Sequence, residues 1–450
     1  MSDGLFDAVL AAGPVAGQVS DRAWVQAMLD FEGALALASA DAGVIPVEAA
    51  EEIARCCRAE DYDIADIGAR AVDIGNPAGP LVRALTARVT PQAAAYVHLG
   101  ATSQDVSDTA AMLVTARSFD ALRTELRSDA ALLAGLAEEH AYTVMPGRSL
   151  LQQAPPVTFG LTAAGWLSGI TAAQARLNGI RRDRLAVQFG GAVGTLAALG
   201  DNGIRVLSGL AERLGLAEPV LPWHTERSRI AEVAGALGQT CGAVAKIARD
   251  ITLLAQTEVG EVYEQGPAGT GGSSTMPHKR NPVAAVLATG STGQAPGLVA
   301  ALLGASAHEH QRAAGAWHAE WRPLSELLRT TGSAVHWLVV SLERLRVDPE
   351  RMRLNLDRTG GLLLAENVAI ELVSASQGAV GRQVASDTVA DCCRAALTGG
   401  GELIDLLAGD PLVRRYLGRD RLTELLDPAG YLGSADEFIR RALDDWKAQS

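Results

Sequence analysis

The segment GTGGSSTMPHKRNP, residues 269–282, joins small and hydroxyl-bearing residues to three side chains that can carry positive charge. Its glycines allow backbone N–H groups to approach a ligand closely, and such groups stabilise an anion that develops during a reaction. A serine such as Ser273 or Ser274 is a poor base at its normal pKa. The neighbouring His278 and Lys279 could help the serine to lose its proton. From composition alone, the alternative is a glycine-rich surface loop before the basic start of a helix.

Length and charge limit the class of protein. The chain has 450 residues, of which 48% are hydrophobic, so it can bury a large core in two or three domains or in one elongated helical body. The formal net charge of -13 argues against a nucleic-acid partner, because neutralising phosphates requires clustered Lys and Arg. An anionic substrate must therefore be captured by a local cationic site that acts against the overall charge.

The hydropathy pattern and the cysteines indicate the cellular compartment in which the protein resides. The N-terminal sequence has no basic segment before an apolar run, and the chain has no uninterrupted apolar stretch of about 18 residues. We therefore expect no membrane contact and a cytoplasmic protein. The five cysteines show no CxxC spacing for a metal or redox site, which fits a reducing compartment.

The apolar residues follow a helical period. Aromatic residues make up only 4% of the chain, whereas Ala and Leu abound. In residues 237–255, apolar positions recur every three or four residues, while Lys246, Arg249 and Asp250 lie off that stripe. Several predicted helices exceed the average globular length of about 11 to 12 residues, which favours an all-α bundle. Similar patterns predict helices over about 105–140, 282–304, 324–345 and 362–376.

Two glycine-rich stretches, residues 190–194 and 266–272, could be taken for nucleotide-binding loops. Neither has the G-x-G-x-x-G pattern after a strand or the G-x-x-x-x-G-K-[ST] pattern, so we interpret both as turns or mobile loops. A change in composition near residues 342–352 predicts the start of a C-terminal domain. The expected division is an N-terminal helical domain at 1–104, a central helical bundle at 105–345 and a C-terminal helical domain at 346–450.

The segment VHLGATSQDVSDT, residues 97–109, carries donors suited to a carboxylate. Thr102, Ser103 and Gln104 lie just before a helix that is predicted to begin near Asp105. A purely structural interpretation is that Ser103 or Asp105 caps that helix. The sequence by itself leaves both interpretations open.

Two more segments combine cationic and polar side chains. PGRSLLQQAPPVTFG, residues 146–160, places Arg148 in a loop that we expect between two helices. A lone arginine usually makes a surface ion pair, so Arg148 alone indicates little. HEHQRAAGAWHAEW, residues 308–321, contains His308 and His310, which would point to different faces of a helix. That spacing disfavours a metal site.

GGSSTMPHKRNP resembles the signature loop of the fumarase/aspartase superfamily. HLGATSQDVSDT, GRSLLQQAPPVTFG and FGGAVGTLAALG are similar to its other sequence blocks and occur in the same order. PWHTERSR, HEHQRAAGAWHAEW and the YLG near the C-terminus resemble the cycloisomerase branch, and the resemblance extends from Leu5 to the end of the chain. It implies a mostly helical three-domain fold with a central bundle of long helices. It also implies a homotetramer whose active sites are shared between subunits.

The resemblance implies conversion of 3-carboxy-cis,cis-muconate, a small anionic tricarboxylate, into 4-carboxymuconolactone during protocatechuate breakdown. It implies that Ser273 transfers a proton and that Lys279 and Asn281 stabilise negative charge. It implies no metal and no organic cofactor. The residues implied in substrate binding are His98, Thr102, Ser103, Gln104, Arg148, Ser149, Gln152, Ser274, Met276, His278 and Arg312.

Two positions depart from related lyases. The lyases for fumarate, argininosuccinate and adenylosuccinate typically have a His after G-R-T, where this chain has Leu150. Adenylosuccinate lyases usually have another catalytic His near the position of Asn76. The cycloisomerase branch commonly has a larger apolar residue at position 150. The absence of both histidines disfavours an adenylosuccinate lyase. An adenylosuccinate-type or related β-elimination lyase of a dicarboxylate is kept as the alternative. A catalytically silent relative is a third hypothesis, although Ser273, Lys279 and Asn281 are all present.

Overall fold

The computed structural model describes residues 4–449, except for 268, 270, 273–275 and 277. Most elements of this described part are helices, and its strands form two short pairs, so the expected all-α class is confirmed. The chain divides into two compact units built from alternating segments. The expected domains at 1–104, 105–345 and 346–450 stay a prediction. Unit 1 comprises Met1–Ser128, Ala172–Ala248 and Ala284–Val340, and unit 2 comprises Asp129–Thr171, Arg249–Val283 and Ser341–Ser450.

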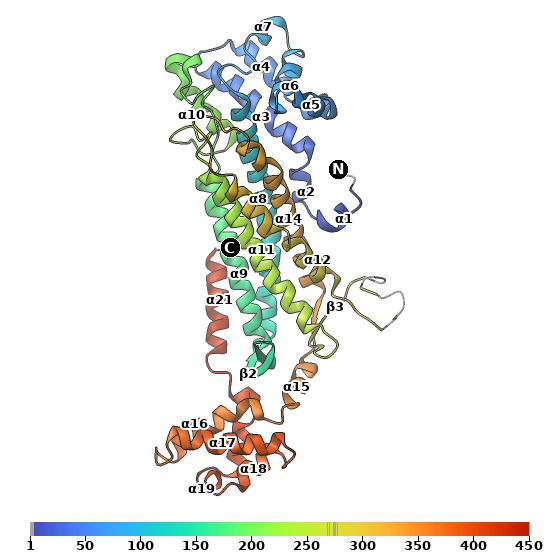
Figure 1. Ribbon diagram of the computed structural model, residues 1–450, viewed down its shortest axis with the longest axis vertical. Coiled ribbons are helices and arrows are strands. Elements are labelled where there is room, and N and C mark those ends of the chain that lie inside the picture. Colours follow the sequence, from blue (N-terminus) through green and yellow to red (C-terminus); the bar gives the residue numbers. More distant parts are fainter. Residues whose placement is uncertain (1–3, 268, 270, 273–275, 277, 450) are drawn as a thin grey trace. The chain divides into compact units, whose positions relative to one another are not determined.

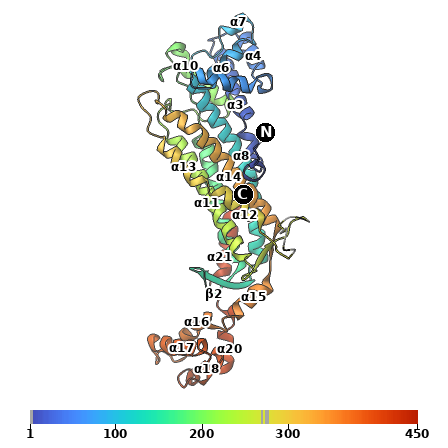
Figure 2. The ribbon, with the colours of Figure 1, turned by 45° about the vertical axis from the view of Figure 1, so that its right-hand side comes forward.

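The long helices give unit 1 its core. The predicted stripe is buried there, as Leu237, Cys241 and Val244 show with at most 2% exposure. In unit 1, segments of α8, α11 and α14 run alongside one another (Figures 1 and 2), and Cys241 of α11 contacts Thr331 of α14 through its thiol. The unit boundaries fall inside α8 (Ser103–Glu139), α9 (Phe159–Asp183), α11 (Ser228–Leu254) and α14 (Ala316–Arg344).

Shorter helices complete unit 1. The helix α3 begins after Ser20, whose hydroxyl accepts a hydrogen bond from the backbone of Ala23, as an N-cap residue does. This helix packs against α4 and α10. The other helices of unit 1 that precede α11 are α1 (Asp7–Leu10), α2 (Val15–Gln18), α3 (Asp21–Asp41), α4 (Val47–Arg55), α5 (Ile64–Arg70), α6 (Ala78–Thr86), α7 (Pro91–Ala94) and α10 (Gly203–Leu214).

Two predicted helices have different bounds in the structure. The helix expected over 282–304 is divided into α12 (Val283–Thr292) and α13 (Ala295–Gly304). Gly293 weakens helix propensity at the break, and Pro296 favours the first turn of a new helix. The helix expected from 324 begins eight residues earlier and continues through Pro323. The buried side chains of Trp317 and Glu320 stabilise these additional turns, so packing overrides the local effect of the proline.

Unit 2 contains the strands. The hairpin of β1 (Val144–Ser149) and β2 (Gln152–Thr158) is antiparallel, so the loop expected over 146–160 is wrong. Three prolines in these strands conceal the pattern, because proline cannot donate to a sheet. A shift of register at Pro146 and Gly147 accommodates them. A second antiparallel pair joins β3 (Val262–Glu264) to β4 (Leu345–Val347).

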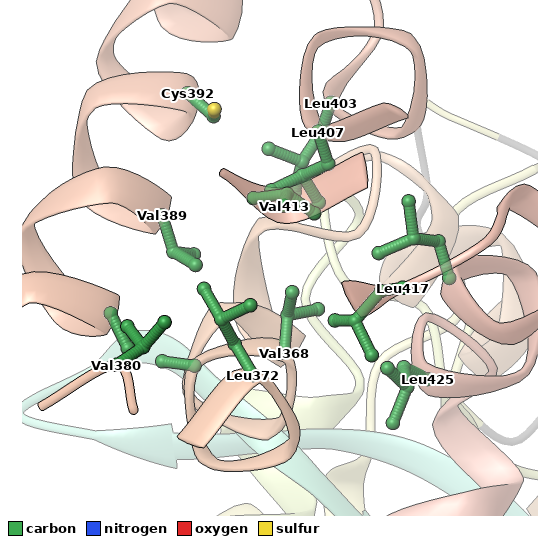
Figure 3. Close-up of a cluster of buried hydrophobic side chains, with 13 residues drawn as sticks. Val368, Leu372, Val380, Val389, Cys392, Leu403, Leu407, Val413, Leu417 and Leu425 are labelled. Atoms are coloured by element: carbon green, nitrogen blue, oxygen red, sulfur yellow. The ribbon is translucent and has the colours of Figure 1, made fainter. Parts of the chain in front are cut away.

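The C-terminal helices of unit 2 enclose their own hydrophobic core. Val368 and Leu372 of α16 lie among side chains of the neighbouring helices, including Val389 and Leu407 (Figure 3). The helix predicted over 362–376 corresponds to a short 3-10 turn followed by α16. The helices that contribute to this core are α16 (Ala365–Ala375), α17 (Arg382–Leu397), α18 (Leu403–Gly409), α19 (Val413–Tyr416) and α20 (Arg419–Leu425). The other C-terminal helices of unit 2 are α15 (Pro349–Asp357) and α21 (Ala435–Gln449).

One helical stretch is unusually apolar for its exposure. By length and composition alone, Val283–Gly304, with a mean hydropathy of 1.2, could cross a membrane, and it is the one such stretch among the described residues. This is weak evidence for a membrane span, since helices of soluble proteins pass the same test. Only 28% of the window is buried, and Val286 and Leu303 are about half exposed.

Candidate active site

The start of α8 in unit 1 holds several of the expected site residues. Thr102 directly precedes the helix, and its backbone N–H donates to Oδ2 of Asp105 at 3.0 Å. The Asp105 backbone N–H donates in turn to the carbonyl oxygen of Thr102 at 2.9 Å. An acidic side chain that reaches back from the third helical residue is typical of a capping box. Asp105 is therefore not the N-cap itself, and Ser103 is the first residue of the helix.

Asp105 also connects α8 to two distant segments. Its Oδ1 lies 2.6 Å from Nε2 of His224 and accepts from the backbone of Gly190 at 3.2 Å. Its Oδ2 accepts from the backbone of Gly191 at 2.9 Å. A Cβ on Gly190 would lie 2.8 Å from the His224 ring, and Gly191 has a φ of 68°. Residues 190–194 therefore form a tight turn beside α8, which agrees with the turn interpretation.

Gln104 and Arg312 make hydrogen bonds within the protein. Gln104 is 5% exposed, and its Nε2 donates to the carbonyl oxygen of His224 at 2.8 Å. Its Oε1 accepts from Nη1 of Arg312 at 3.1 Å. Arg312 also donates through Nη2 to the carbonyl oxygens of Gly191 and Ala192. Arg312 thus links the glycine turn to α8, and these contacts occupy donors that the sequence assigned to a substrate.

A buried ion network lies one turn further along α8. Nη1 of Arg227 donates to Oδ2 of Asp108 at 2.8 Å, and Nε of Arg227 donates to Oε1 of Glu320 at 3.0 Å. The indole N–H of Trp317 donates to Oδ1 of Asp108 at 3.0 Å. Burial acts to raise the pKa of Asp108, but the Arg227 charge and these hydrogen bonds hold the pKa below its usual value. The network joins α8, α14 and the residues before α11.

His308 lies beside this network. Its Nε2 is 3.2 Å from Oε1 of Glu320. His308 and His310 both lie between α13 and α14, so the helix assumed for them is wrong. His310 and Gly315 have φ values of 47° and 119°, which a helix does not permit.

A cavity of about 760 Å³ in unit 1 borders the ion network. Its lining includes Asp108, Arg227 and Glu320 together with apolar side chains such as Met28 and Trp321. None of the expected site residues within the described part of the chain lines it.

His98 lies before α8 in a left-handed backbone conformation, with a φ of 62°. Its Nδ1 is 2.6 Å from Oε1 of Glu32, a buried residue of α3. Burial acts to lower the pKa of His98, but the charge and hydrogen bond of Glu32, aided by Asp105, outweigh it and raise the pKa above its ordinary value. The carboxylate of Glu32 therefore favours the cationic form of His98, which is close in sequence to Thr102.

Arg148 belongs to unit 2 and is not a lone surface arginine. Its Nη1 donates to Oε2 of Glu261 at 2.8 Å, and its Nη2 donates to Oε1 at 2.6 Å. Asn355 of α15 donates to the same carboxylate through Nδ2 at 2.7 Å. Gln153 contacts the carbonyl oxygen of Asn355 at 3.2 Å, so the hairpin and α15 share this cluster.

The hairpin turn next to Arg148 has an unusual sequence. Ser149 pairs with Gln152, so Leu150 and Leu151 form a two-residue turn. Their φ values are 51° and 65°, in the left-handed region that favours Asn and Gly. Their exposed fractions are 95% and 74%. Ser149 and Gln152 are exposed beside them.

The signature segment is described in part. Ser273 and Ser274 lie outside the described residues. The backbone N–H of Asn281 donates to the carbonyl oxygen of Gly271 at 2.9 Å, and its Nδ2 donates to the same oxygen at 3.1 Å. A Cβ on Gly271 would lie 2.8 Å from the carbonyl oxygen of Asn281, so this approach requires glycine. Asn281 therefore joins the two ends of the segment.

The cationic residues of the segment are exposed. The Lys279 backbone N–H donates to the carbonyl oxygen of Met276 at 3.0 Å, and Met276 is 42% exposed. His278 and Lys279 are exposed. The Arg280 guanidinium lies 5.5 Å from the ring centre of Tyr263 in β3. The segment thus presents positive charge to solvent.

Sequence reasoning missed the groups that hold these residues. Glu32 and Glu261 were not candidates, and His224 appeared only in a block that resembles a family. No local signal identifies such partners, because Glu32 and His98 are 66 positions apart. Among the described residues, no three His, Cys, Asp or Glu side chains are grouped so that they could hold a metal ion.

The helical fold and the ordered blocks define an enzyme of the fumarase/aspartase type. Residues 9–297 match the lyase family model, and residues 361–442 match the model of the adenylosuccinate lyase C-terminus. The chain belongs to the lyase family of the fumarase/aspartase superfamily.

Within this family, the chain is similar over nearly its whole length to several individual enzymes. The chain is 46% identical to a 3-carboxy-cis,cis-muconate cycloisomerase of Pseudomonas aeruginosa, over 99% of this chain and 96% of the relative. It is 42% identical to a nitrosuccinate lyase of Streptomyces davaonensis, over 98% of this chain and 95% of the relative. The crystal structure of the 3-carboxy-cis,cis-muconate lactonizing enzyme from Pseudomonas putida matches with a TM-score of 0.93 and 42% identity, covering 99% of both chains.

Proposed function

We propose that this protein is a cycloisomerase that converts 3-carboxy-cis,cis-muconate into 4-carboxymuconolactone. The observation that carries the proposal is the 46% identity, over 99% of the chain, to a relative of that name. The exposed cations Lys279 and Arg280 support it, since a chain with a net charge of -13 needs local positive charge to bind a tricarboxylate.

The proposed reaction forms one carbon–oxygen bond. A carboxylate oxygen of the substrate adds to an alkene carbon and closes the lactone ring. The alkene electron pair moves to the neighbouring carbon, whose carboxylate becomes an enolate-like dianion. A proton then adds to that α-carbon, so the reaction takes up one proton and cleaves no carbon–carbon bond. The enzyme must stabilise the dianion and deliver the proton.

We assign these tasks to residues of the sequence blocks. Ser273 delivers the proton, an assignment that rests on its position in the GSSTMPHKRN block. Lys279 and Asn281 stabilise the dianion, together with backbone N–H groups of the segment. The residues around Thr102 and Arg148 bind the remaining carboxylates. No metal or organic cofactor has a part in this proposal.

We further propose a cytoplasmic homotetramer with active sites shared between subunits. The exposed apolar stretch Val283–Gly304 supports an oligomer, because a second copy of the chain would remove its side chains from water. Val286→Glu should therefore lower the mass of the assembly in analytical ultracentrifugation. An unchanged mass would contradict an interface on this stretch.

The experiment that tests the activity uses purified protein and 3-carboxy-cis,cis-muconate. Loss of the diene absorbance in the ultraviolet, together with the lactone in the NMR spectrum of the products, is the expected result. Prior dialysis against EDTA should leave the rate unchanged. Absence of turnover by a folded protein would contradict the proposal.

The alternative is a β-elimination lyase of a dicarboxylate, which the 42% identity to a nitrosuccinate lyase favours. Such an enzyme releases an unsaturated dicarboxylate, so fumarate formation from nitrosuccinate or adenylosuccinate is the discriminating assay. Leu150 argues against this alternative, because a leucine cannot act as the acid that the lyases place there. Turnover of a succinyl compound without turnover of the muconate would favour the lyase.

A further inference from the structure

A buried glutamate of α3 pairs with the histidine that precedes α8. Nδ1 of His98 lies 2.6 Å from Oε1 of Glu32. The Glu32 side chain is completely buried, and Oε2 has no hydrogen-bond partner within the described part of the chain. The His98 side chain is 20% exposed. Its second nitrogen, Nε2, makes no hydrogen bond to any described residue.

The pair places the His98 imidazole against the carboxylate of a completely buried side chain. An ionised carboxylate in a protein interior requires a counter-charge, and His98 is the partner that contacts it. The charged groups that act on His98 are Glu32 from α3 and Asp105 from α8, and both are negative. Asp105 is itself bound to His224. This arrangement favours the imidazolium form of His98 and fixes the proton of Nδ1 on the side of Glu32.

His98 differs from the other histidines of the chain. His224 and His308 are buried beside carboxylates, and His318 contacts a backbone carbonyl oxygen through its Nε2. His336 forms a similar pair, with its Nδ1 2.8 Å from Oε1 of Glu125. However, His336 lies on α14, outside the sequence blocks that carry the proposed site. Among the described residues, His98 and His336 are the histidines whose Nδ1 is hydrogen-bonded to a glutamate, and of these only His98 belongs to the block that contains Thr102.

We propose that Glu32 is a positioning residue of the active site, which holds His98 as an imidazolium so that Nε2–H donates to a carboxylate of the substrate. The inference rests on the proposed function, because it assumes an anionic substrate near the start of α8. The left-handed conformation of His98, with its φ of 62°, supports it, since such backbone strain is concentrated at functional sites. Glu32 thereby allows a chain of net negative charge to present a fixed cation.

The test is the pH dependence of the Glu32→Gln variant with 3-carboxy-cis,cis-muconate. Glutamine has the same shape but no charge, so His98 should lose its proton at a lower pH than in the wild type. KM at pH 8 should rise roughly tenfold, the loss should shrink as the pH falls below 6, and kcat should change little. A KM that rises by the same factor at every pH, or a fall confined to kcat, would overturn the proposal.

Glu125→Gln is the matched control. It removes the carboxylate of the analogous His336 pair, and Glu125 also has a buried Oε2 without a partner in the described structure. The kinetics and their pH profile should not change. A shift as large as that of Glu32→Gln would assign the effect to the overall charge of unit 1 and overturn the proposal.

The double variant His98→Gln, Glu32→Gln keeps the test valid if a single variant fails to fold. It replaces the pair by two neutral amides that can hydrogen-bond to each other. Its KM at low pH should match that of His98→Gln, and it should lack the rise in KM between low pH and pH 8 that is expected of Glu32→Gln. If the double variant bound the muconate more tightly than His98→Gln at all pH values, Glu32 would affect substrate binding by a route other than the His98 imidazole. That result would contradict the proposal.

An NMR titration of the histidine rings separates this inference from the proposed function. The His98 signal, assigned by its loss in His98→Gln, should titrate at a lower pH in Glu32→Gln than in the wild type. An unchanged titration overturns the pairing. A wild-type enzyme that does not turn over the muconate overturns the proposed function, and the NMR result then still decides whether Glu32 holds the imidazolium.

Discussion

The guanidinium of Arg148 and the carboxylate of Glu261 form a two-pronged ion pair, with N–O distances of 2.8 and 2.6 Å. Glu261 is completely buried, and Asn355 donates a further hydrogen bond to its Oε1. Because an unpaired buried charge is costly, Arg148 stabilises unit 2 whether or not it also binds a substrate. The geometry of a bidentate pair is one that lysine cannot reproduce.

Arg148→Met should lower the free energy of unfolding by about 3 to 5 kcal/mol, because it leaves the Glu261 carboxylate buried without its cation. The double variant Arg148→Met, Glu261→Gln should recover much of that loss, since no buried charge remains. Urea unfolding followed by circular dichroism measures both. A single variant as stable as the wild type would show that the pair contributes nothing.

Arg227→Met should destabilise unit 1 by a similar amount, about 3 to 5 kcal/mol, because Asp108 and Glu320 then share a buried site without a cation. In the wild type, the pKa of Asp108 in the folded state lies below the ordinary Asp value of about 3.9. The stability that ionised Asp108 contributes is therefore fully present above that ordinary value, and it is lost as the pH falls through the pKa of the folded state. Wild-type stability should therefore show this loss only below about pH 4. Thermal unfolding of the wild type and of Arg227→Met between pH 3 and 8 measures the difference in their stability, with Arg229→Met as an adjacent control.

Replacing Leu150 and Leu151 by Asn and Gly should raise the stability of the hairpin by about 1 to 3 kcal/mol. Both leucines have left-handed φ values, which cost about 1 to 2 kcal/mol per residue, and Asn-Gly is the preferred pair in such a turn. Their high exposure means that little packing is lost. Denaturant unfolding is the measurement, and a less stable variant would mean that the leucines are covered in the assembled protein.

Ser273→Ala should lower kcat at least about a hundredfold with little change in KM, because positioned proton transfer contributes about 10² to 10⁴. Steady-state kinetics with 3-carboxy-cis,cis-muconate measure the effect. Ser274→Ala is the neighbouring control and should affect KM more than kcat. A Ser273→Ala enzyme that retains more than half of the wild-type kcat would remove this residue from the mechanism.

Subunit mixing tests the shared active site. Ser273→Ala and the double variant Arg148→Met, Glu261→Gln should both be nearly inactive, and the double variant avoids an unpaired buried charge. After unfolding, mixing in equal amounts and reassembly, roughly one site in four should carry neither defect, given random assembly of a closed oligomer. Activity should approach that fraction of the wild type.

A mixture that is hetero-oligomeric by mass but no more active than its parents would place both blocks in one chain. Reassembled wild-type protein is the control for losses during refolding. This outcome would leave the lactonisation chemistry open, because it concerns only which chain supplies each residue.

The sequence by itself determined the helical class and the order of the blocks. Periodic apolar residues such as Leu237, Cys241 and Val244 predict a buried stripe, and the structure confirms it. This succeeds because helix formation depends on residues three or four positions apart. The hairpin at 144–158 was missed because strand pairing, unlike helix formation, depends on more distant partners. The prolines of the hairpin also make its sequence resemble a loop.

Only the tertiary structure decided which groups hold the candidate site residues. The sequence selected His98 and Arg148 by their resemblance to family blocks, but it gave no sign of Glu32 or Glu261. Each of these buried carboxylates is far along the chain from its partner, so no local spacing predicts the contact. Burial and a nearby opposite charge together set the charge state of such groups, and both arise only when the chain folds.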